Sequence, residues 1–367
     1  MIAAIDLEAL DPAGLQRFQA LQNQAVDAVT QRFYEAHGAT YVRFGPRGRE
    51  ACREDLAFHL EFLRPALEFG ALQPMVDYLA WLGGVLAARA IPVEHLALSL
   101  AWLGEFFAER MDGADGAKVA AALDAAKTKF LALGQAVAPP AAPAEPWPEA
   151  TAFEAALLAG RQREALGIVD ACLDNGRSLV DLELHVILPA LYQIGEKWHA
   201  NKVTVAQEHL ATAIVQSVMT AGLLRSQPPR MIGKKVLLAC VAGNSHAIGL
   251  RMVSDGFQLA GWDVQFLGAN VPTSALVGQA IAWKPDLLGL SVSFAQQLRV
   301  VKDVIADLDA RLGGARPAVI IGGLAVNRFD QLAGALGADA HRADAPSAVA
   351  YASQSLAMGG GRAEVSS

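Results

Sequence analysis

The stretch VLLACVAGNSHAIG, residues 236–249, decides the fold of the carboxyl-terminal part of this chain. Its first seven residues are apolar, and glycine, asparagine and serine, which are typical of turns, follow them at once. A short apolar run that ends in a turn predicts a strand buried on both faces, as in a parallel sheet. The turn carries a histidine, His246, directly after this strand.

Three further apolar runs follow at intervals, and helical stretches separate them. They are DVQFLG at 263–268, LLGLSVS at 287–293 and AVIIGG at 318–323, with a weaker fifth strand at 338–341. Strands that alternate with helices predict a parallel sheet with helices on both faces and right-handed crossovers. Five strands favour the flavodoxin-like order 2-1-3-4-5, whose ligand crevice lies beyond the carboxyl ends of strands 1 and 3.

Three short sequences meet at this predicted crevice. One is the loop with His246, the second is the hydroxyl pair Ser291 and Ser293, and the third is the glycine pair Gly322 and Gly323. A histidine there can be a metal ligand or a base, and paired hydroxyls and glycines can line a slot for a ligand. Each sequence alone is also explained as an ordinary loop or strand end. The chain lacks a Walker loop and a G-x-G-x-x-G motif, which argues against a nucleotide site.

Together these residues resemble the cobalamin-binding domain, whose pattern is D-x-H-x-x-G, then S-x-L or similar, then G-G. The resemblance covers residues 234–358 and implies a cobalt corrinoid cofactor. It implies that His246 replaces the cofactor's own dimethylbenzimidazole base as the lower axial cobalt ligand. It also implies that Gly249 lets the loop pack. Asn244 departs from the pattern, because many members have an acidic residue there, and an amide cannot take a proton.

The same resemblance assigns the other two sequences at the crevice. Ser291 and Ser293 would contact the displaced nucleotide tail of the cofactor. Gly322 and Gly323 would make room for that tail. These roles come from the family and not from the spacing of the residues.

Residues 151–228 are predicted to form a small helical bundle of about four helices. Thr204 followed by Gln207 is a capping-box pattern, so a helix is expected to begin at Val205. The preceding helix is expected to end at Trp198 and His199. The predicted corner therefore gathers an indole, two histidines and a glutamate at one joint between helices.

The sequence LPALYQIGEKWHANKVTVAQEH, which contains this corner, resembles the helical cap of light-sensing adenosylcobalamin regulators. The resemblance implies that Trp198 and Glu208 pack against and hydrogen-bond the 5′-deoxyadenosyl group. It implies that His199 binds cobalt from above after light breaks the cobalt–carbon bond, and that His209 supports the corrin. Taken alone, Trp198 is better explained as ordinary core packing.

Residues 1–135 are predicted to be an all-α domain of five or six helices. Leu56, Leu60, Leu63 and Leu67 form one apolar stripe, and Leu96, Leu100, Leu103 and Phe107 form another. Five prolines among alanines make residues 136–150 a stiff linker, and residues 359–367 are expected to be a frayed tail.

The front domain resembles globin-like sensory domains without haem, and also the photocobilins, which hold a biliverdin beside the corrin. That resemblance proposes a bilin site, with the candidate residues Tyr41, Arg43, Arg47, Arg49, His37 and His59. Guanidinium groups can hold propionates, although an arginine cluster is also explained as a solvated face or a salt-bridged turn. Cys52 is a candidate for covalent attachment.

Composition excludes several classes of function. The formal net charge is −7 and no run of lysines or arginines occurs, so we expect no direct nucleic-acid binding. The first residues lack a signal-peptide pattern, and no apolar run is long enough for a membrane helix. The three cysteines contain no CxxC pair, which fits a reducing cytoplasm.

We therefore expect a cytoplasmic, non-enzymatic photosensor that holds adenosylcobalamin, with biliverdin as a second chromophore. It would form a homo-oligomer whose state depends on light, and would signal to a partner protein of unknown identity. The alternatives are a corrinoid methyl carrier of a methyltransferase system and a cobalamin sensor that does not respond to light.

Overall fold

The computed structural model describes residues 7–133, 144–227, 229–329 and 334–357. The chain divides into two units, residues 1–138 and 139–367, which are described separately below. Most of the predicted linker, up to residue 143, and the predicted tail at 359–367 lie outside the described residues.

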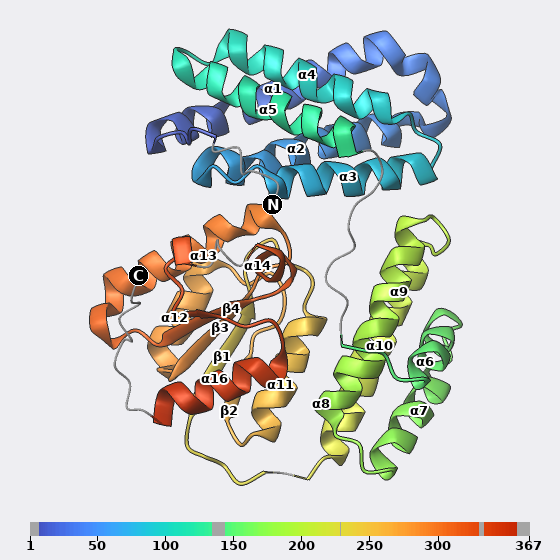
Figure 1. Ribbon diagram of the computed structural model, residues 1–367, viewed down its shortest axis with the longest axis vertical. Helices are drawn as coiled ribbons and strands as arrows, with labels where there is room; N and C mark the ends of the chain where they lie inside the picture. Colours follow the sequence, from blue (N-terminus) through green and yellow to red (C-terminus); the bar gives the residue numbers. More distant parts are fainter. Residues whose placement is uncertain (1–6, 134–143, 228, 330–333, 358–367) are drawn as a thin grey trace. The chain divides into compact units, whose positions relative to one another are not determined.

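The first unit consists of α-helices in its described residues (Figure 1). They are α1 (Pro12–Tyr41), α2 (Gly45–Phe69), α3 (Gln73–Ala88), α4 (Val93–Arg110) and α5 (Ala114–Leu133), with a 3-10 turn η1 (Val42–Phe44). The two predicted leucine stripes lie on α2 and α4, and all eight of their residues are buried. These stripes form the interior because residues spaced three and four apart share one face of a helix. The all-α expectation is confirmed for these residues.

The second unit begins with a helical bundle. Its elements are α6 (Glu149–Leu158), α7 (Gln162–Asp174), α8 (Leu179–Leu182), a π-helical turn η2 (Glu183–Ile187), α9 (Leu188–His199) and α10 (Val205–Arg225). The Thr204 hydroxyl accepts a hydrogen bond from the Gln207 backbone N–H, and the Thr204 N–H donates to Gln207 Oε1 at 2.9 Å, so the predicted capping box is confirmed. The predicted corner between Trp198 and Val205 is therefore present as the joint of α9 and α10.

A five-stranded parallel sheet completes the second unit. The strands are β1 (Lys235–Cys240), β2 (Asp263–Phe266), β3 (Leu287–Ser291), β4 (Ala318–Gly322) and β5 (Ala340–His341), in the order β2-β1-β3-β4-β5. All four pairings are parallel, and Cys240 of β1 lies beside Ser291 of β3. The predicted strand order is confirmed, so the ends of β1 and β3 meet at one edge of the sheet.

Helices cover both faces of this sheet (Figure 1). They are α11 (Ile248–Leu259), α12 (Thr273–Trp283), α13 (Leu298–Leu312), α14 (Leu324–Arg328) and α16 (Ala345–Ala357), with 3-10 turns η3 (Ala295–Gln297) and η4 (Gly313–Ala315). On one face, Leu250 and Phe257 of α11 pack with alternate residues of β1 and with α16. On the other face, α12 packs beside α13.

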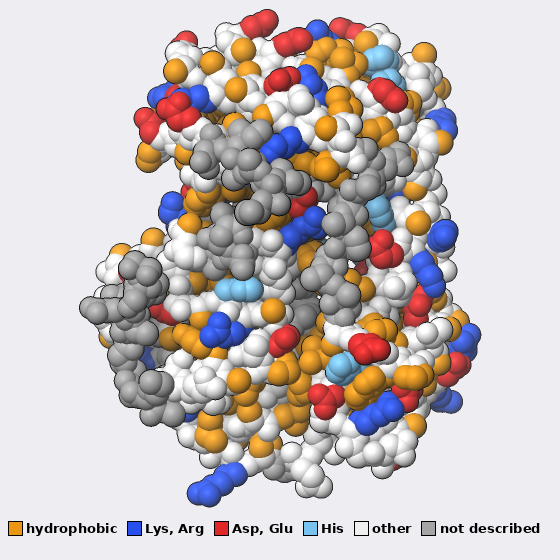
Figure 2. Space-filling view, in the orientation of Figure 1, with side chains coloured by type: hydrophobic (Ala, Val, Ile, Leu, Met, Phe, Trp, Pro, Cys, Tyr) orange, Lys and Arg blue, Asp and Glu red, His pale blue; other side chains and the backbone are white. Residues whose placement is uncertain are grey.

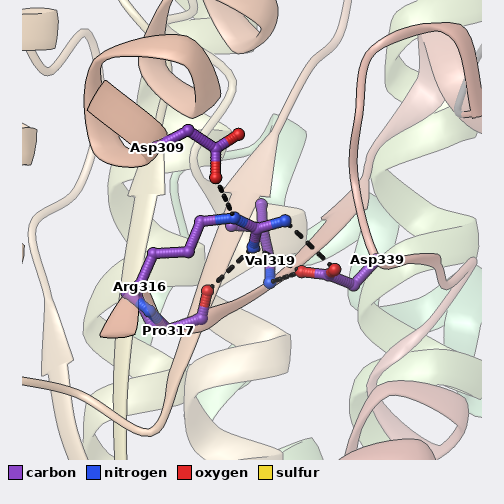
Figure 3. A network of polar contacts seen from close by, with 5 residues as sticks. All are labelled: Asp309, Arg316, Pro317, Val319 and Asp339. Atoms are coloured by element: carbon purple, nitrogen blue, oxygen red, sulfur yellow. Dashed lines mark hydrogen bonds and ion pairs between the residues drawn. The ribbon is translucent and has the colours of Figure 1, made fainter. Parts of the chain in front are cut away.

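The edge strand β5 is held in place by a polar network at the opposite end of the sheet from the predicted crevice (Figure 3). The Arg316 guanidinium binds Asp309 at 2.9 Å and Asp339 at 2.6 and 3.1 Å. Asp339 also accepts a hydrogen bond from the Val319 N–H of β4. Because the Arg316 side chain is only 7% exposed, these bonds anchor a strand too short to hold its own register.

Acidic and basic side chains are interspersed on the face seen in Figure 2. The described helices include none with both the length and the apolar character needed to span a lipid bilayer.

Candidate functional site

The loop after β1 is tied to the end of β3 by a buried amide. Asn244 is 0% exposed, and its Nδ2 donates to the Ser291 carbonyl at 2.9 Å. Its Oδ1 accepts from the His246 backbone N–H at 3.0 Å. A carboxylate at this position could accept from His246 but could not donate to Ser291. The amide thus holds the backbone that carries His246.

The His246 side chain stands at the crevice with an accessible surface. Its ring meets Phe294 edge to face, with 5.1 Å between ring centroids. Desolvation by neighbouring protein atoms lowers the pKa of His246, and the Glu208 carboxylate opposes this shift in part. The imidazole is therefore neutral near pH 7 and can offer a nitrogen lone pair to a metal.

A second buried amide, Gln297, was not singled out from the sequence. Its Oε1 accepts from the backbone N–H groups of Ser293 and Phe294 at 3.0 and 3.2 Å. Its Nε2 donates to the Gly243 carbonyl at 2.8 Å. One side chain thus joins the loop after β3 to the loop that carries His246. The only sequence signal is a glutamine four residues after Ser293, which has no meaning until the two strands are known to be neighbours.

The serines and glycines predicted at the crevice do lie at the ends of β3 and β4. Ser291 is buried, and Ser293 is partly exposed. A Cβ atom at Gly322 would lie 2.7 Å from the Arg342 carbonyl oxygen, and one at Gly323 would lie 2.5 Å from that of Val292. Packing inside the domain therefore already requires both glycines. Their contact with a cofactor tail stays a prediction.

Gly249 corrects one expectation. A Cβ atom there would meet no protein atom within 4 Å, so glycine is not needed for the loop to pack. The residue lies in the first turn of α11 and is exposed. It leaves open space three residues from His246 in the sequence.

The corner of the bundle contributes the other predicted residues. Trp198 and His199 end α9 and are partly exposed, and Trp198 packs against the bundle core. Glu208 is partly exposed in the first turn of α10, where its carboxylate meets His209 Nδ1 at 2.5 Å and accepts from the Thr212 hydroxyl at 3.1 Å. Thr212 was missed from the sequence, although its spacing of four residues places it beside Glu208 on the helix.

The structure brings the bundle corner and the crevice loop together. Glu208 acts electrostatically on His246, although the two residues are 38 positions apart in the sequence. Ile248, two residues after His246, packs against the bundle core. The His246 imidazole and the Glu208 carboxylate thus lie close enough to interact, and Trp198, His199 and His209 belong to the same corner of the bundle as Glu208.

Several candidate bilin residues of the first unit are already bonded to other protein groups. The Arg43 guanidinium donates to the Ala90 carbonyl at 2.9 Å, and that of Arg49 donates to Gln31. Arg47 is exposed, and Tyr41 bonds to His95 at 2.7 Å between its hydroxyl and Nδ1. The guanidinium groups of Arg43 and Arg49 are therefore already engaged by protein oxygens.

Two further bilin candidates, His59 and Cys52, are fully and partly buried, and their roles stay predictions. His59 is 2% exposed and bonds through Nδ1 to the Tyr78 hydroxyl at 2.9 Å, so it belongs to the core of the unit. Burial raises the pKa of the Cys52 thiol to about 11. Since the thiolate is the attacking species, Cys52 is poorly suited to covalent attachment near neutral pH.

Fold and site together define a class of protein: a parallel α/β domain with a histidine at its switch point, faced by a helical bundle. Two family models, each described as a B12 binding domain, match residues 234–351 and 150–221. The dimethylamine corrinoid protein 3 of Methanosarcina mazei is 32% identical over 117 residues, which are 32% of this chain and 69% of that protein. The chain belongs to the B12-binding family.

A second relative is named as a transcriptional repressor and not as a corrinoid protein. The HTH-type transcriptional repressor CarA of Myxococcus xanthus is 30% identical over 174 residues, which are 46% of this chain. The alignment spans 57% of CarA, little more than half its length. Among solved structures, the monomethylamine corrinoid protein of Methanosarcina barkeri is 21% identical, with a TM-score of 0.48, over 55% of this chain and 96% of its own. The family assignment rests on the sequence matches.

Proposed function

We propose that this chain is a cobalamin-dependent photoreceptor whose helical bundle responds to the state of the cofactor. Bound adenosylcobalamin would supply a cobalt–carbon bond that light breaks. The residues of the chain would hold the cofactor, shield its upper face and convert the loss of the adenosyl group into a movement of the bundle. The family is shown by sequence, whereas the adenosyl form and the response to light belong to this proposal.

The metal-binding side chains that the site offers fit a corrinoid cofactor. The ring nitrogens of a corrin already hold the cobalt, so a protein needs to add only axial ligands. Among the described residues no group of three His, Cys, Asp or Glu side chains could hold a bare metal ion. His246 offers one neutral imidazole on an ordered loop, and the space above Gly249 is open.

One observation carries the proposal: Glu208 of the bundle corner lies within electrostatic range of His246. On this basis we propose that the lower-ligand candidate and the adenosyl-binding candidates belong to a single site. In this proposal Trp198 and Glu208 pack on the adenosyl group, and His209 supports the corrin beside them. His199 becomes the upper cobalt ligand once the adenosyl group has left.

The test uses the full chain loaded with adenosylcobalamin in darkness and then illuminated with green light. We expect a change in the absorbance spectrum together with a change in oligomeric size. The His199→Ala variant should bind the cofactor in darkness but give a different spectrum after illumination. An unchanged spectrum and size on illumination would contradict the proposal, and identical illuminated spectra would contradict the role of His199.

The dimethylamine corrinoid relative favours a second candidate, a corrinoid methyl carrier. In that case the cofactor would be methylcobalamin, and His199 and Glu208 would have no special role. Methyl transfer between the loaded chain and a methyltransferase, with no response to light, would decide for this candidate. A cobalamin sensor that ignores light would show neither behaviour.

The second chromophore of the proposal is biliverdin, bound by the first unit. One support is the resemblance of that unit to the photocobilins. The other is a cluster of rings in which the ring centroids of His37 and His95 are 4.3 Å apart and the Tyr41 hydroxyl bonds to His95. Co-expression with a haem oxygenase should give a red-absorbing band in the purified protein. Without that band, the bilin site is to be abandoned. In either case, we propose that the chain acts as an oligomer, performs no catalysis itself and signals to a partner protein.

A further inference from the structure

A pair of buried carboxyl groups joins the helical bundle to the α/β domain. Glu183 lies in the π-helical turn η2 of the bundle, and Asp255 lies on α11. Both residues are 0% exposed. Neither belongs to the cofactor site described above.

The sequence of α11 shows why a carboxylate reaches the bundle. Ile248, Met252 and Asp255 are spaced at i, i+4 and i+7, and therefore share one face of the helix. Ile248 and Met252 pack into the bundle core. Asp255 continues this stripe, so its carboxyl group enters an apolar contact between the two parts of the unit.

The hydrogen bonds of the pair are incomplete. The Arg251 Nε donates to Asp255 Oδ1 at 2.7 Å, which satisfies one oxygen. Asp255 Oδ2 and both carboxyl oxygens of Glu183 are buried and have no donor among the described residues. A buried acceptor without a donor is costly, and two ionised carboxylates would also repel each other.

A single proton removes both problems. A protonated carboxyl group can donate a hydrogen bond to a neighbouring carboxylate, which is how paired acids share a site in proteins. Arg251 bonds to Asp255, which favours the ionised form there and leaves the proton to Glu183. Burial and the nearby Asp255 raise the pKa of Glu183 well above its ordinary value, in agreement with this arrangement.

We propose that Glu183 and Asp255 form a buried proton-binding site, in which protonated Glu183 donates to Asp255 Oδ2 and thereby holds the bundle against α11. Among the described residues, the charged groups that act on this pair are Glu183, Asp255 and Arg251. The π-helical turn supports the assignment, because such turns cost helix stability and occur frequently at functional sites.

The Glu183–Asp255 pair also lies where α11, the helix that follows the cofactor loop, packs on the bundle. The loop that carries His246 leads directly into α11, and Asp255 is two turns further along that helix. Separation of the bundle from α11 would bring both carboxyl groups into water, where Glu183 would release its proton to solvent. This consequence rests on the proposed function, whereas the proton-binding site itself does not.

The test is infrared spectroscopy of the full chain near neutral pH, without cofactor and in darkness. We expect a carbonyl band of a protonated carboxylic acid that shifts when the glutamates carry ¹³C and is lost in Glu183→Gln. The control is Glu154→Gln, because Glu154 is another buried glutamate of the bundle but is ion-paired with Lys197. It should keep the band.

Isotope labelling of the native chain keeps the test independent of how the variants fold. Absence of any protonated-acid band overturns the proposal. A band that shifts with labelled aspartate and not with labelled glutamate also overturns it, as does a band of full intensity in Glu183→Gln. None of these measurements involves cobalamin or light, so their failure is distinct from failure of the proposed photoreceptor.

Discussion

At the scale of single residues, the site depends on amides that order the backbone around a neutral imidazole. Asn244 and Gln297 together make five hydrogen bonds to the loops after β1 and β3. One of these bonds is buried and the other four are partly buried, so water replaces them poorly when a side chain is removed. Residues that order a ligand in this way are expected to matter for metal affinity nearly as much as the ligand itself.

The first prediction concerns Gln297→Ala. Loss of its three bonds leaves two backbone N–H groups and one carbonyl without their partner, so the loops lose order. We expect the Kd for cobalamin to rise by roughly 10- to 100-fold, as for outer-shell partners of metal ligands. Equilibrium binding followed by absorbance measures this.

The matched control for that prediction is Gln296→Ala. Gln296 is the adjacent residue, and its Oε1 has no hydrogen-bond partner among the described residues. Its removal should leave the Kd close to that of the native chain. Equal losses in the two variants would show that the region, and not the Gln297 amide, controls affinity.

The second prediction concerns His59 and acid stability of the first unit. Burial lowers the pKa of His59 from 6.5 to about 3, so the unfolded chain binds a proton more readily than the folded one between these values. The free energy of unfolding should therefore be unaffected above about pH 6.5 and fall by about 1.4 kcal/mol per pH unit below it. Hydrogen exchange of the buried amides of α2, corrected for the intrinsic rate, measures the fall.

His59→Gln provides the comparison. Glutamine can still bond to the Tyr78 hydroxyl but does not titrate, so this part of the pH dependence should disappear. If the variant and the native chain lose protection in parallel between pH values of about 6 and 4, another group is responsible.

At the scale of elements, the corner of the site is fixed by how α10 begins. Its first turn places Glu208 toward the crevice, and the capping box at Thr204 sets where that turn starts. A shift of the helix register by one residue would rotate its side chains by about 100°, since each turn holds 3.6 residues. Helix capping thus determines which side chains face the cofactor loop.

The third prediction follows for Thr204→Ala. Loss of the cap should lower the free energy of unfolding of the second unit by about 1 kcal/mol. It should also weaken the dark adenosylcobalamin complex, because the Glu208 turn frays. Denaturant unfolding and cofactor binding measure the two effects.

Thr220→Ala is the control within the same helix. The Thr220 hydroxyl is exposed and donates to the Gln216 carbonyl one turn earlier, so it caps nothing. Alanine there should leave stability and binding nearly unchanged or slightly improved. A loss as large as that of Thr204→Ala would contradict the importance of the cap.

At the scale of the whole molecule, the groups of the proposed cobalamin site all belong to the second unit. His246, Glu208 and the corner at Trp198 lie between residues 139 and 367, and the two matches to B12 binding domains do as well. The first unit contributes no group to this set. Its proposed bilin function is therefore separable from cobalamin binding.

The fourth prediction is that a chain of residues 139–367 folds and binds cobalamin with the Kd of the full chain. The physical reason is that this unit has its own apolar cores, one in the bundle and one under the sheet. Circular dichroism and equilibrium binding measure folding and affinity. A large loss of affinity in a folded unit would show that the first unit completes the site.

Much of the fold of this protein could be predicted from its sequence alone. The apolar runs after residue 235 predicted the parallel sheet and its strand order, the Thr204 and Gln207 pair predicted where α10 begins, and the leucine spacing predicted the helices of the first unit. These features are local, because hydrophobic periodicity and capping depend on residues only a few positions apart. The motif around His246 is also local, because its residues lie within a few positions of each other.

Only the tertiary structure decided which residues and elements are neighbours in space. Gln297 acquires its role because β3 is the neighbour of β1, and Glu183 acquires its own because α11 packs on the bundle. Burial likewise placed His59 in the core of the first unit, and it gave the crevice glycines a packing reason. Hydrogen bonds and desolvation act over a few ångströms in space, and spacing along the chain does not encode these distances.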